Sequence, residues 1–344
     1  TIHNSANYSW SHLCNLIYLM KRKFCIAPMM KKTDKHFRFL SRLLSENAYL
    51  YTEMIHSNAI IRGDANKLLS FNDCEQPVAL QLGGSNPKDL GIAASIGEDF
   101  GYSEINLNVG CPSKKVKSGN FGVFLMKDKN LLSECLYEMK KNVSLPVTVK
   151  CRIGVDEFEG KDFLFNFVNE ISNVGIKTFI IHARKAISGL DTKRNRSIPK
   201  LNYKIVRDLK EEFSELEIIL NGGIDNLKEC KNLLNNFDGI MLGRKIYDDP
   251  LFLLDVEKEI FNNVSQESLK SIMNKYLVYV LNLPNQKDIN RALNHFMQLI
   301  KVISKNKKVR NEILDSLKNK DISIEDIFID LKEDLLRKDL ALNL

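Results

Sequence analysis

Short apolar runs rich in β-branched residues alternate with amphipathic stretches along the first 250 residues of the chain. The apolar runs are the expected strands, and they comprise Phe24–Met29, Tyr49–Glu53, Val78–Leu82, Glu104–Val109, Val147–Arg152, Thr178–His182, Glu217–Asn221 and Gly239–Leu242. Helical spacing of apolar residues follows in Pro87–Phe100, Asn130–Lys141, Phe163–Val174, Tyr203–Phe213 and Leu227–Asn236. The connection between the second and third runs lacks this spacing, so we expect a loop there that contains Gly63.

Eight strands with intervening helices predict a (β/α)8 TIM barrel, an α/β fold, over residues 24–255. A doubly wound open sheet is the main alternative. A dinucleotide-binding sheet of that kind would carry a G-x-G-x-x-G turn after its first strand, and this chain has none there. The pattern therefore favours the barrel.

The character of the chain changes after Pro250. No glycine occurs beyond Gly243, and Pro284 is the one proline in residues 264–344. Helical periodicity predicts a small bundle made of Leu269–Leu281, Ile289–Ser304, Val309–Leu317 and Ile324–Leu336. We therefore expect a C-terminal helical domain over residues 264–344.

Composition and charge exclude several classes of protein. The 344 residues contain no apolar run of the length that spans a membrane. The seven cysteines form no Cys-x-x-Cys pair, which argues against a disulfide framework and a structural zinc site and fits a reducing compartment. Lysine and arginine total 50 against 43 acidic residues, and this net charge of +7 does not by itself indicate nucleic-acid binding.

Residues 1–23 are expected to form an extension before the barrel. Leu13–Met20 is mostly apolar and is followed by three basic residues, which fits a surface helix end better than the remnant of a leader. We expect a cytoplasmic protein and leave an organelle open. The sequence gives no indication of the oligomeric state.

Glycine and a cation follow the last two expected strands. Asn221-Gly222-Gly223 ends the seventh strand, and Gly243-Arg244 ends the eighth. Glycine alone would fit a tight turn. Because the loops after strands seven and eight form the usual phosphate site of this fold, the two pairs together predict a phosphate-binding site.

Three further polar residues lie on expected strands near the active-site end. A lysine inside a barrel is costly unless it meets an anion or is neutral, so Lys150 is either a Schiff-base lysine or a cation that faces an electron-rich cofactor ring. Gln81 can donate and accept hydrogen bonds at once, which suits the polar edge of a flavin. His182 carries little information alone.

Cys111 has a setting that no other cysteine shares. It follows a strand end and Gly110, and Pro112 prevents the strand from continuing. We therefore expect its thiol on a loop at the barrel mouth and interpret it as catalytic. The other six cysteines are expected to be small buried apolar residues.

Basic residues gather after the fourth and sixth expected strands. Lys114, Lys115 and Lys117 have no acid among residues 111–127, and residues 184–200 hold Arg184, Lys185, Lys193, Arg194, Arg196 and Lys200 against Asp191 alone. Solvated loops would account for either cluster. Two such clusters at one end of a barrel indicate a polyanion that lies across the mouth.

Nine phrases, taken in order, resemble the tRNA-dihydrouridine synthases, and most closely the DusA branch, the tRNA-dihydrouridine(20/20a) synthases. They are APM at 27–29, LYTEM at 50–54, EQPVALQLGGS at 75–85, EINLNVGCPS at 104–113, FGVFLM at 121–126, PVTVKCRIG at 146–154, FIIHARKA at 179–186, NGGI at 221–224 and GIMLGR at 239–244. The resemblance departs at Lys31-Lys32, where the family usually has an acid and a tryptophan, and at residues 295–314.

This resemblance implies an FMN-binding barrel followed by a helical domain that binds tRNA. NADPH or NADH would reduce the flavin, which would pass hydride to C6 of uridine 20 or 20a in the D loop while Cys111 protonates C5. The family's FMN-contacting positions match Pro28, Met29, Gln81, Lys150, His182, Asn221, Gly222, Gly223, Gly243 and Arg244. Its tRNA-contacting positions match Asn108, Lys193 and Arg196.

Other functions remain as alternatives. An FMN-dependent reductase of a free pyrimidine or small enone would use the same barrel without tRNA. A tRNA-binding factor that has lost catalysis would bind tRNA and carry little flavin. A Schiff-base aldolase built on Lys150 is a more distant possibility.

Overall fold

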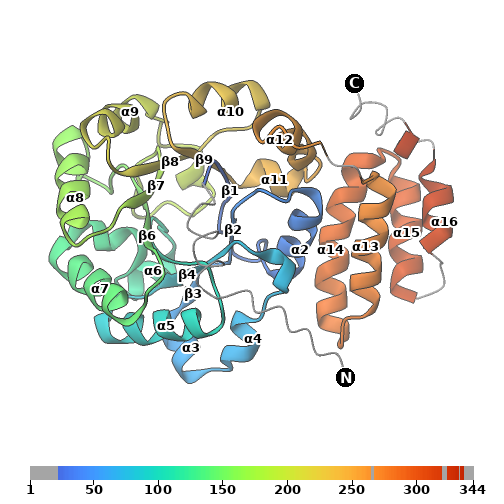
Figure 1. Cartoon of the computed structure of the whole chain (residues 1–344), viewed down its shortest axis with the longest axis horizontal. Helices are drawn as coiled ribbons and strands as arrows, with labels where there is room; N and C mark the ends of the chain where they lie inside the picture. The colour runs from blue at the N-terminus through green and yellow to red at the C-terminus, as the bar shows by residue number, and fades with distance from the viewer. Residues whose placement is uncertain (1–21, 265–266, 320–323, 333, 337–344) are drawn as a thin grey trace, which may run out of the picture.

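Nine parallel strands form the barrel in the part of the chain that the structure, a computed structural model, describes: residues 22–264, 267–319, 324–332 and 334–336. The strands are β1 Phe24–Ile26, β2 Leu50–Tyr51, β3 Ile55–His56, β4 Val78–Gly83, β5 Glu104–Val109, β6 Val147–Arg152, β7 Thr178–His182, β8 Glu217–Asn221 and β9 Gly239–Leu242. Helices surround them (Figure 1). The predicted TIM barrel is confirmed.

The strands follow the order β1-β9-β8-β7-β6-β5-β4-β2, and β3 also pairs with β4. A parallel bridge between Cys25 and Tyr49 joins β1 to the start of β2 and closes the ring. The second predicted strand, Tyr49–Glu53, is therefore reduced to β2, and β3 follows beyond its predicted end; both pair with β4. The ladder breaks between them because the Thr52 hydroxyl accepts a hydrogen bond from the Gln81 backbone N–H at 2.9 Å.

The first strand is shorter than the predicted Phe24–Met29. It ends at Ile26 because Pro28 has no N–H to donate and the Met29 N–H bonds the Thr33 hydroxyl at 2.9 Å. The turn that follows carries Met29 and leads into α2.

Five predicted helices fall within two residues of observed ones at each end, among eleven α-helices that the described residues form around the barrel. They are α2 Lys35–Leu44, α3 Ser57–Arg62, α4 Ala65–Leu69, α5 Pro87–Asp99, α6 Lys114–Ser118, α7 Lys129–Asn142, α8 Lys161–Asn173, α9 Tyr203–Glu212, α10 Leu227–Leu234, α11 Arg244–Asp248 and α12 Phe252–Ile260. Three short 3₁₀ helices are η1 Asp73–Glu75, η2 Gly122–Lys127 and η3 Arg194–Arg196.

The loop predicted around Gly63 is wrong, because α3 and α4 occupy it. The two helices have six and five residues, too few for helical spacing of apolar residues to show. Gly63 ends α3 by donating its N–H to the Ala59 carbonyl, and Asp64 begins α4 by accepting the Lys67 N–H at 3.1 Å.

The barrel interior combines an apolar layer with buried charge. The apolar layer contains Cys25, Ala27, Tyr49, Tyr51, Ala79, Ile180, Ile219 and Met241. At the amino ends of the strands Arg22 bonds Glu104 at 2.6 Å and Glu217 at 2.8 Å. This network fills the amino end of the barrel, so the carboxyl ends of the strands are left for a site.

Four helices, α13 Leu269–Leu281, α14 Gln286–Ile303, α15 Lys307–Asn319 and α16 Ile324–Asp330, lie side by side next to the barrel (Figure 1). The first coincides with its prediction. The second begins three residues early because Asn285 caps it by accepting the Asp288 N–H at 3.0 Å. The fourth, predicted to reach Leu336, ends as a continuous helix at Asp330.

Helix α2 connects the barrel to these helices. The Asp34 carboxylate caps α2 at the N–H groups of His36 and Phe37, both at 3.1 Å, and also bonds His295 of α14 at 3.0 Å. The His36 ring bonds the Tyr279 hydroxyl of α13 at 2.7 Å. One short segment after the first strand therefore holds the helical region in place.

Two further predictions concern residues 13–20 and membrane-spanning segments. The surface helix end expected in residues 13–20 lies outside the described residues. Among the residues that are described, no helix combines the length and the apolar character that crossing a membrane requires.

Candidate active site

The predicted site residues come from separate strand ends, and the fold brings them to one end of the barrel. Met29 follows β1, Cys111 follows β5, Asn221 ends β8 and Arg244 follows β9. Because all strands are parallel and closed into a ring, their carboxyl ends share one mouth. The loops that carry these residues therefore face a common space.

Cys111 lies on a short fixed loop between β5 and α6, and its side chain is half-buried. The Asn108 side-chain oxygen accepts the backbone N–H of Cys111 at 2.9 Å, and the Cys111 carbonyl accepts the Val123 N–H at 3.1 Å. Gly122 has a φ of 61°, and any side chain there would meet that carbonyl. The thiol is thus held at the mouth, where the sequence predicted it.

Gln81 and Asn108 are joined inside the barrel. The Asn108 amide nitrogen donates to Gln81 Oε1 at 2.9 Å, and the Gln81 amide nitrogen donates to Asn106 Oδ1 at 2.8 Å. Gln81 is 1% exposed and Asn108 is 9% exposed. Each amide keeps one hydrogen or lone pair for another partner, so Gln81 can still contact a cofactor ring.

Lys150 and His182 lie on neighbouring strands beneath the mouth. Lys150 Nζ donates to Asn221 Oδ1 at 3.0 Å, and Asn221 in turn donates to the Met241 carbonyl at 2.7 Å. Burial, with repulsion from Arg152, lowers the pKa of Lys150 to about 8. Burial and the cations Arg152 and Lys150 lower the pKa of His182 well below its ordinary value, so its ring is neutral at pH 7.

The glycines after β8 and β9 form a cradle with no room for side chains. Gly222 has a φ of 115°, and a Cβ there would lie 2.3 Å from the His182 ring. Gly223 has a φ of 78°, and a Cβ there would meet Leu201 at 2.4 Å. A Cβ at Gly243 would make a tight contact with the Met29 sulfur, at 3.1 Å, and Arg244 begins α11 beside it. Backbone N–H groups and a cation can therefore reach a bound phosphate.

Cations gather at this mouth without a matching number of acids. Burial lowers the pKa of each of Lys32, Lys150, Arg152, Arg184, Arg196 and His182, and neighbouring cations lower each pKa further. Asp248 opposes the effect at Lys32. Mutual repulsion of this kind is relieved by an anion, so the mouth fits a ligand that carries several negative charges.

The basic loop after β7 is held by hydrogen bonds of a buried side chain of the loop itself. Asn195 is buried and bonds the backbone of Ile187 and Leu190. Its neighbour Lys193 is exposed on the loop surface, and Arg196 is half-buried. Lys185 pairs with Glu159 at 2.7 Å and is thereby neutralised. Lys193 and Arg196 are the better placed residues of this cluster for a polyanion.

Arg152 joins this loop to the loop of Cys111. Its guanidinium donates to the carbonyls of Gly110 at 2.9 Å and of Lys185 and Asn195, both at 3.1 Å. Arg152 was not selected from the sequence, because its partners are backbone atoms of distant loops. Asn106 was also missed. The available signal was the spacing of Glu104, Asn106 and Asn108 at alternate positions of β5, which puts the three side chains on one face.

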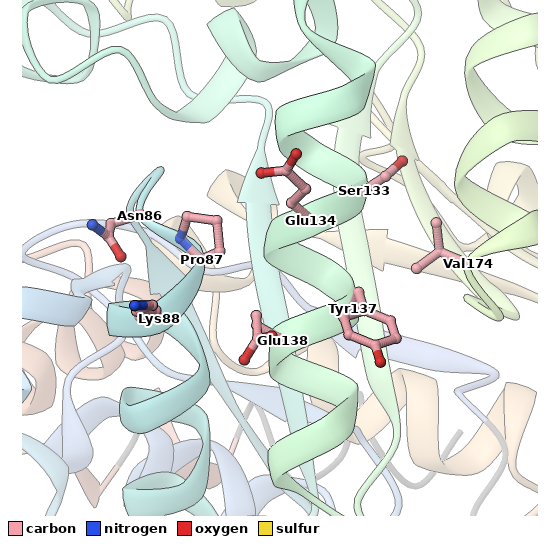
Figure 2. Close-up of a pocket in the computed structure, with 8 residues that line it drawn as sticks. All are labelled: Asn86, Pro87, Lys88, Ser133, Glu134, Tyr137, Glu138 and Val174. Carbon is pink, nitrogen blue, oxygen red and sulfur yellow. The ribbon is translucent and has the colours of Figure 1, made fainter.

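A hollow of about 790 Å³ lies on the outer surface, lined by residues of α5 and α7, Val174 and the turn before α5 (Figure 2). It includes Tyr137 and Glu138 and none of the predicted site residues. Among the described residues no group of histidine, cysteine and acidic side chains is arranged to hold a metal ion. The barrel mouth is therefore the candidate active site.

Comparison with known proteins identifies the family of the chain. The family model described as "Dihydrouridine synthase (Dus)" matches residues 25–336, which include every element named above except part of the first strand. The chain belongs to the dihydrouridine synthase family. It is accordingly a flavin-dependent oxidoreductase.

Relatives match over most of their length. The tRNA-dihydrouridine(20/20a) synthase of Synechocystis sp. (strain ATCC 27184 / PCC 6803 / Kazusa) is 42% identical over 294 residues, 85% of this chain and 88% of the relative. The protein of the same name from Escherichia coli O6:H1 is 49% identical over 243 residues, 70% of this chain and 73% of the relative. The match of the family model, residues 25–336, includes the barrel and extends into the helical region.

A solved structure supports the fold independently. The old yellow enzyme homologue from Zymomonas mobilis superposes on 73% of this chain and 92% of its own with a TM-score of 0.51, at 10% sequence identity. Such a likeness supports the barrel architecture alone.

Proposed function

We propose that this protein is an FMN-dependent tRNA-dihydrouridine synthase that reduces the C5–C6 double bond of uridine 20 or 20a in the D loop, with NADPH as the reductant. The observation that carries the proposal is the half-buried Cys111 thiol at a mouth crowded with cations. The names of the relatives favour tRNA as the substrate.

The residues at the mouth fit FMN. Gly222, Gly223, Gly243 and Arg244 would hold its phosphate, since they offer backbone N–H groups and a cation where side chains are excluded. Pro28, Met29, Gln81, Lys150 and His182 would contact the ring and the ribityl chain. FMN, when bound, supplies the hydride that uridine receives at C6.

Cys111 would supply the proton. Addition of hydride to C6 leaves negative charge on the uracil carbonyl and C5, and the Cys111 S–H donates its proton to C5. Asn108 holds the backbone of Cys111, so the thiol is aimed by a fixed loop rather than by a mobile one. Lys150 would favour negative charge on the cofactor ring, and the neutral His182 would donate a hydrogen bond there.

The target uridine must leave the tRNA fold to reach the mouth. Lys193 and Arg196 would contact backbone phosphates beside it, and Asn108, which is nine-tenths buried, would meet the base rather than the backbone. The helical region α13–α16 lies next to the mouth through α2 and would carry further tRNA contacts.

The test is an absorbance spectrum of the purified protein, followed by reaction with unmodified tRNA and NADPH. We expect flavin bands and dihydrouridine at position 20 or 20a of the digested tRNA. Flavin bands with reduction of free uracil derivatives only would favour a small-molecule reductase. A protein that binds tRNA and takes up no FMN would instead be a binding factor, and the proposal would be wrong.

A further inference from the structure

A column of polar side chains crosses the barrel interior from the site to the opposite end. The Cys111 N–H donates to Asn108 at 2.9 Å, and the chain of donors continues through Gln81, Asn106 and Thr148 to Glu104. These five side chains are 9%, 1%, 0%, 1% and 0% exposed. The column is therefore closed to solvent along its whole length.

The strand register accounts for the column. Gln81 of β4 lies opposite Asn106 of β5, and Asn106 lies opposite Thr148 of β6. Glu104 and Asn108 flank Asn106 at alternate positions of β5, so they point into the same interior. The distances from Gln81 Nε2 to Asn106 Oδ1 and from Asn106 Nδ2 to Thr148 Oγ1 are both 2.8 Å.

Every hydrogen bond in the column runs in one direction. Each of the four side chains Asn108, Gln81, Asn106 and Thr148 donates a hydrogen bond to the next member of the column in the direction of Glu104. Each also accepts a hydrogen bond from the group before it, on the side of Cys111. Glu104 bonds Arg22 at 2.6 Å and the Tyr51 hydroxyl at 3.1 Å, and a carboxylate paired in this way only accepts. It therefore requires the Thr148 hydroxyl to donate, which leaves the Thr148 oxygen to accept from Asn106.

The same requirement passes along the column. An amide has a donor end and an acceptor end, so the orientation of Asn106 sets that of Gln81, and Gln81 sets that of Asn108. If Asn108 turned over, its NH₂ would face the N–H groups of Gly110 and Cys111, which are themselves donors. The loop that carries the thiol would then have to move.

We propose that Glu104 and Thr148 are positioning residues for Cys111, acting through the oriented column Asn106–Gln81–Asn108. This proposal rests on the proposed role of Cys111 as the proton donor. Displacement of a reacting group by about 1 Å can lower turnover about a hundredfold, so a loosened column should lower kcat.

Thr148→Val tests the proposal in the FMN-bound enzyme, because it keeps the side-chain shape and removes the hydroxyl. We expect kcat for tRNA reduction to fall at least about tenfold. The FMN content should stay within about twofold, since the glycines and Arg244 that would hold the FMN phosphate lie outside the column. The rate of flavin reduction by NADPH without tRNA should also stay within about twofold, since it does not use the Cys111 thiol. Thr148→Ser restores the hydroxyl and should restore kcat.

A double variant separates a positioning role from a general loss of structure. Adding Thr148→Val to Cys111→Ala should cost no further activity if Thr148 acts through Cys111. Glu104→Gln, which can donate to Thr148, is a second way to disturb the column and should lower kcat in the same manner. If Cys111→Ala itself keeps full turnover, the proposed proton donor is wrong, whatever Thr148 does.

Three results would overturn the positioning role. The first is native kcat in Thr148→Val. The second is equal losses from Thr148→Val in the presence and absence of Cys111. The third is a parallel loss of FMN content or flavin reduction, which would make Thr148 a residue of the cofactor site or of the fold.

Discussion

Two cysteines of this chain with accessible thiols have different surroundings. Cys111 is held at the mouth by Asn108, whereas Cys74 lies exposed in η1, so the prediction that it is a buried apolar residue is wrong. A general role of free thiols, such as sensitivity to oxidation, would affect both. A role as acid in the reaction would affect Cys111 alone.

Cys111→Ala should therefore lower tRNA reduction at least about a hundredfold, because proton transfer by a positioned acid contributes about that much. FMN content and flavin reduction by NADPH should be unchanged. Cys74→Ala is the matched control and should keep full activity. Dihydrouridine formation in single-turnover experiments checks this, and native turnover of Cys111→Ala would remove the acid role.

Lys150 should make FMN binding depend on pH. Burial and Arg152 lower its pKa to about 8 in the free protein, and an anionic ligand favours its charged form. The affinity for FMN is then highest below pH 8. It falls as pH rises through 8, and the loss of affinity approaches about tenfold per pH unit. Fluorescence titration of the apoprotein with FMN from pH 7 to 9.5 measures this.

The control for the pH dependence is Lys150→Met. This variant should bind FMN more weakly at pH 7 and show a flat profile over the same range, since His182 is already neutral there. An unchanged pH slope in Lys150→Met would assign the titration to another group.

At the scale of elements, the loop after β7 combines a rigid interior with a charged surface. Asn195 and Arg152 fix its backbone, and Lys193 and Arg196 on either side of Asn195 face outward or toward the mouth. Replacement of the two cations thus removes charge without removing the bonds that hold the loop.

Replacing Lys193 and Arg196 by alanine should weaken tRNA binding and lower the slope of log affinity against log salt by about two, one for each lost phosphate contact. Filter binding from 50 to 300 mM salt measures the slope. Replacement of Lys177, exposed before β7 at the other end of the barrel, and Lys231, paired with Glu259, is the matched control. Equal slopes in the two double variants would contradict the polyanion interpretation.

The sequence predicted strands and long helices well because their signals are local. Glu217–Asn221 and Leu269–Leu281 were placed to the residue, since each is a continuous run with one periodicity. The helices α3 and α4 were missed because one or two turns carry no periodicity. Arg152 and Asn195 were missed because their importance comes from bonds to distant backbone atoms, which leave no mark on neighbouring residues.

At the scale of the whole molecule, Asp34 links the barrel to the helical region. It caps α2 and bonds His295 of α14, and the rings of Phe37 and Tyr247 pack against His295 at 5.4 and 5.9 Å. Burial alone would raise the pKa of Asp34, but the hydrogen bond and charge of His295 lower it to about 2. The ionised carboxylate is therefore part of the interface.

This pKa predicts how stability depends on pH. A carboxyl with a depressed pKa stabilises the fold fully above its unfolded value of about 3.8, and the contribution of about 2 kcal/mol is lost as pH falls toward 2. Asp34→Asn keeps the helix cap and removes the charge, so it should lower the free energy of unfolding at pH 7 by about that amount and by much less at pH 2.5. Urea unfolding at the two pH values measures the difference, and an equal loss at both would contradict it.

Arg22 sets a limit on how far the chain can be trimmed from its amino-terminal side. It lies two positions before β1, yet its guanidinium bonds Glu104 and Glu217 at the floor of the barrel. A cut after Arg22 leaves the fully buried Glu104 carboxylate without its cation, at a cost of about 3–5 kcal/mol. Any shortening of the chain that removes Arg22 therefore deprives the floor of the barrel of its buried cation.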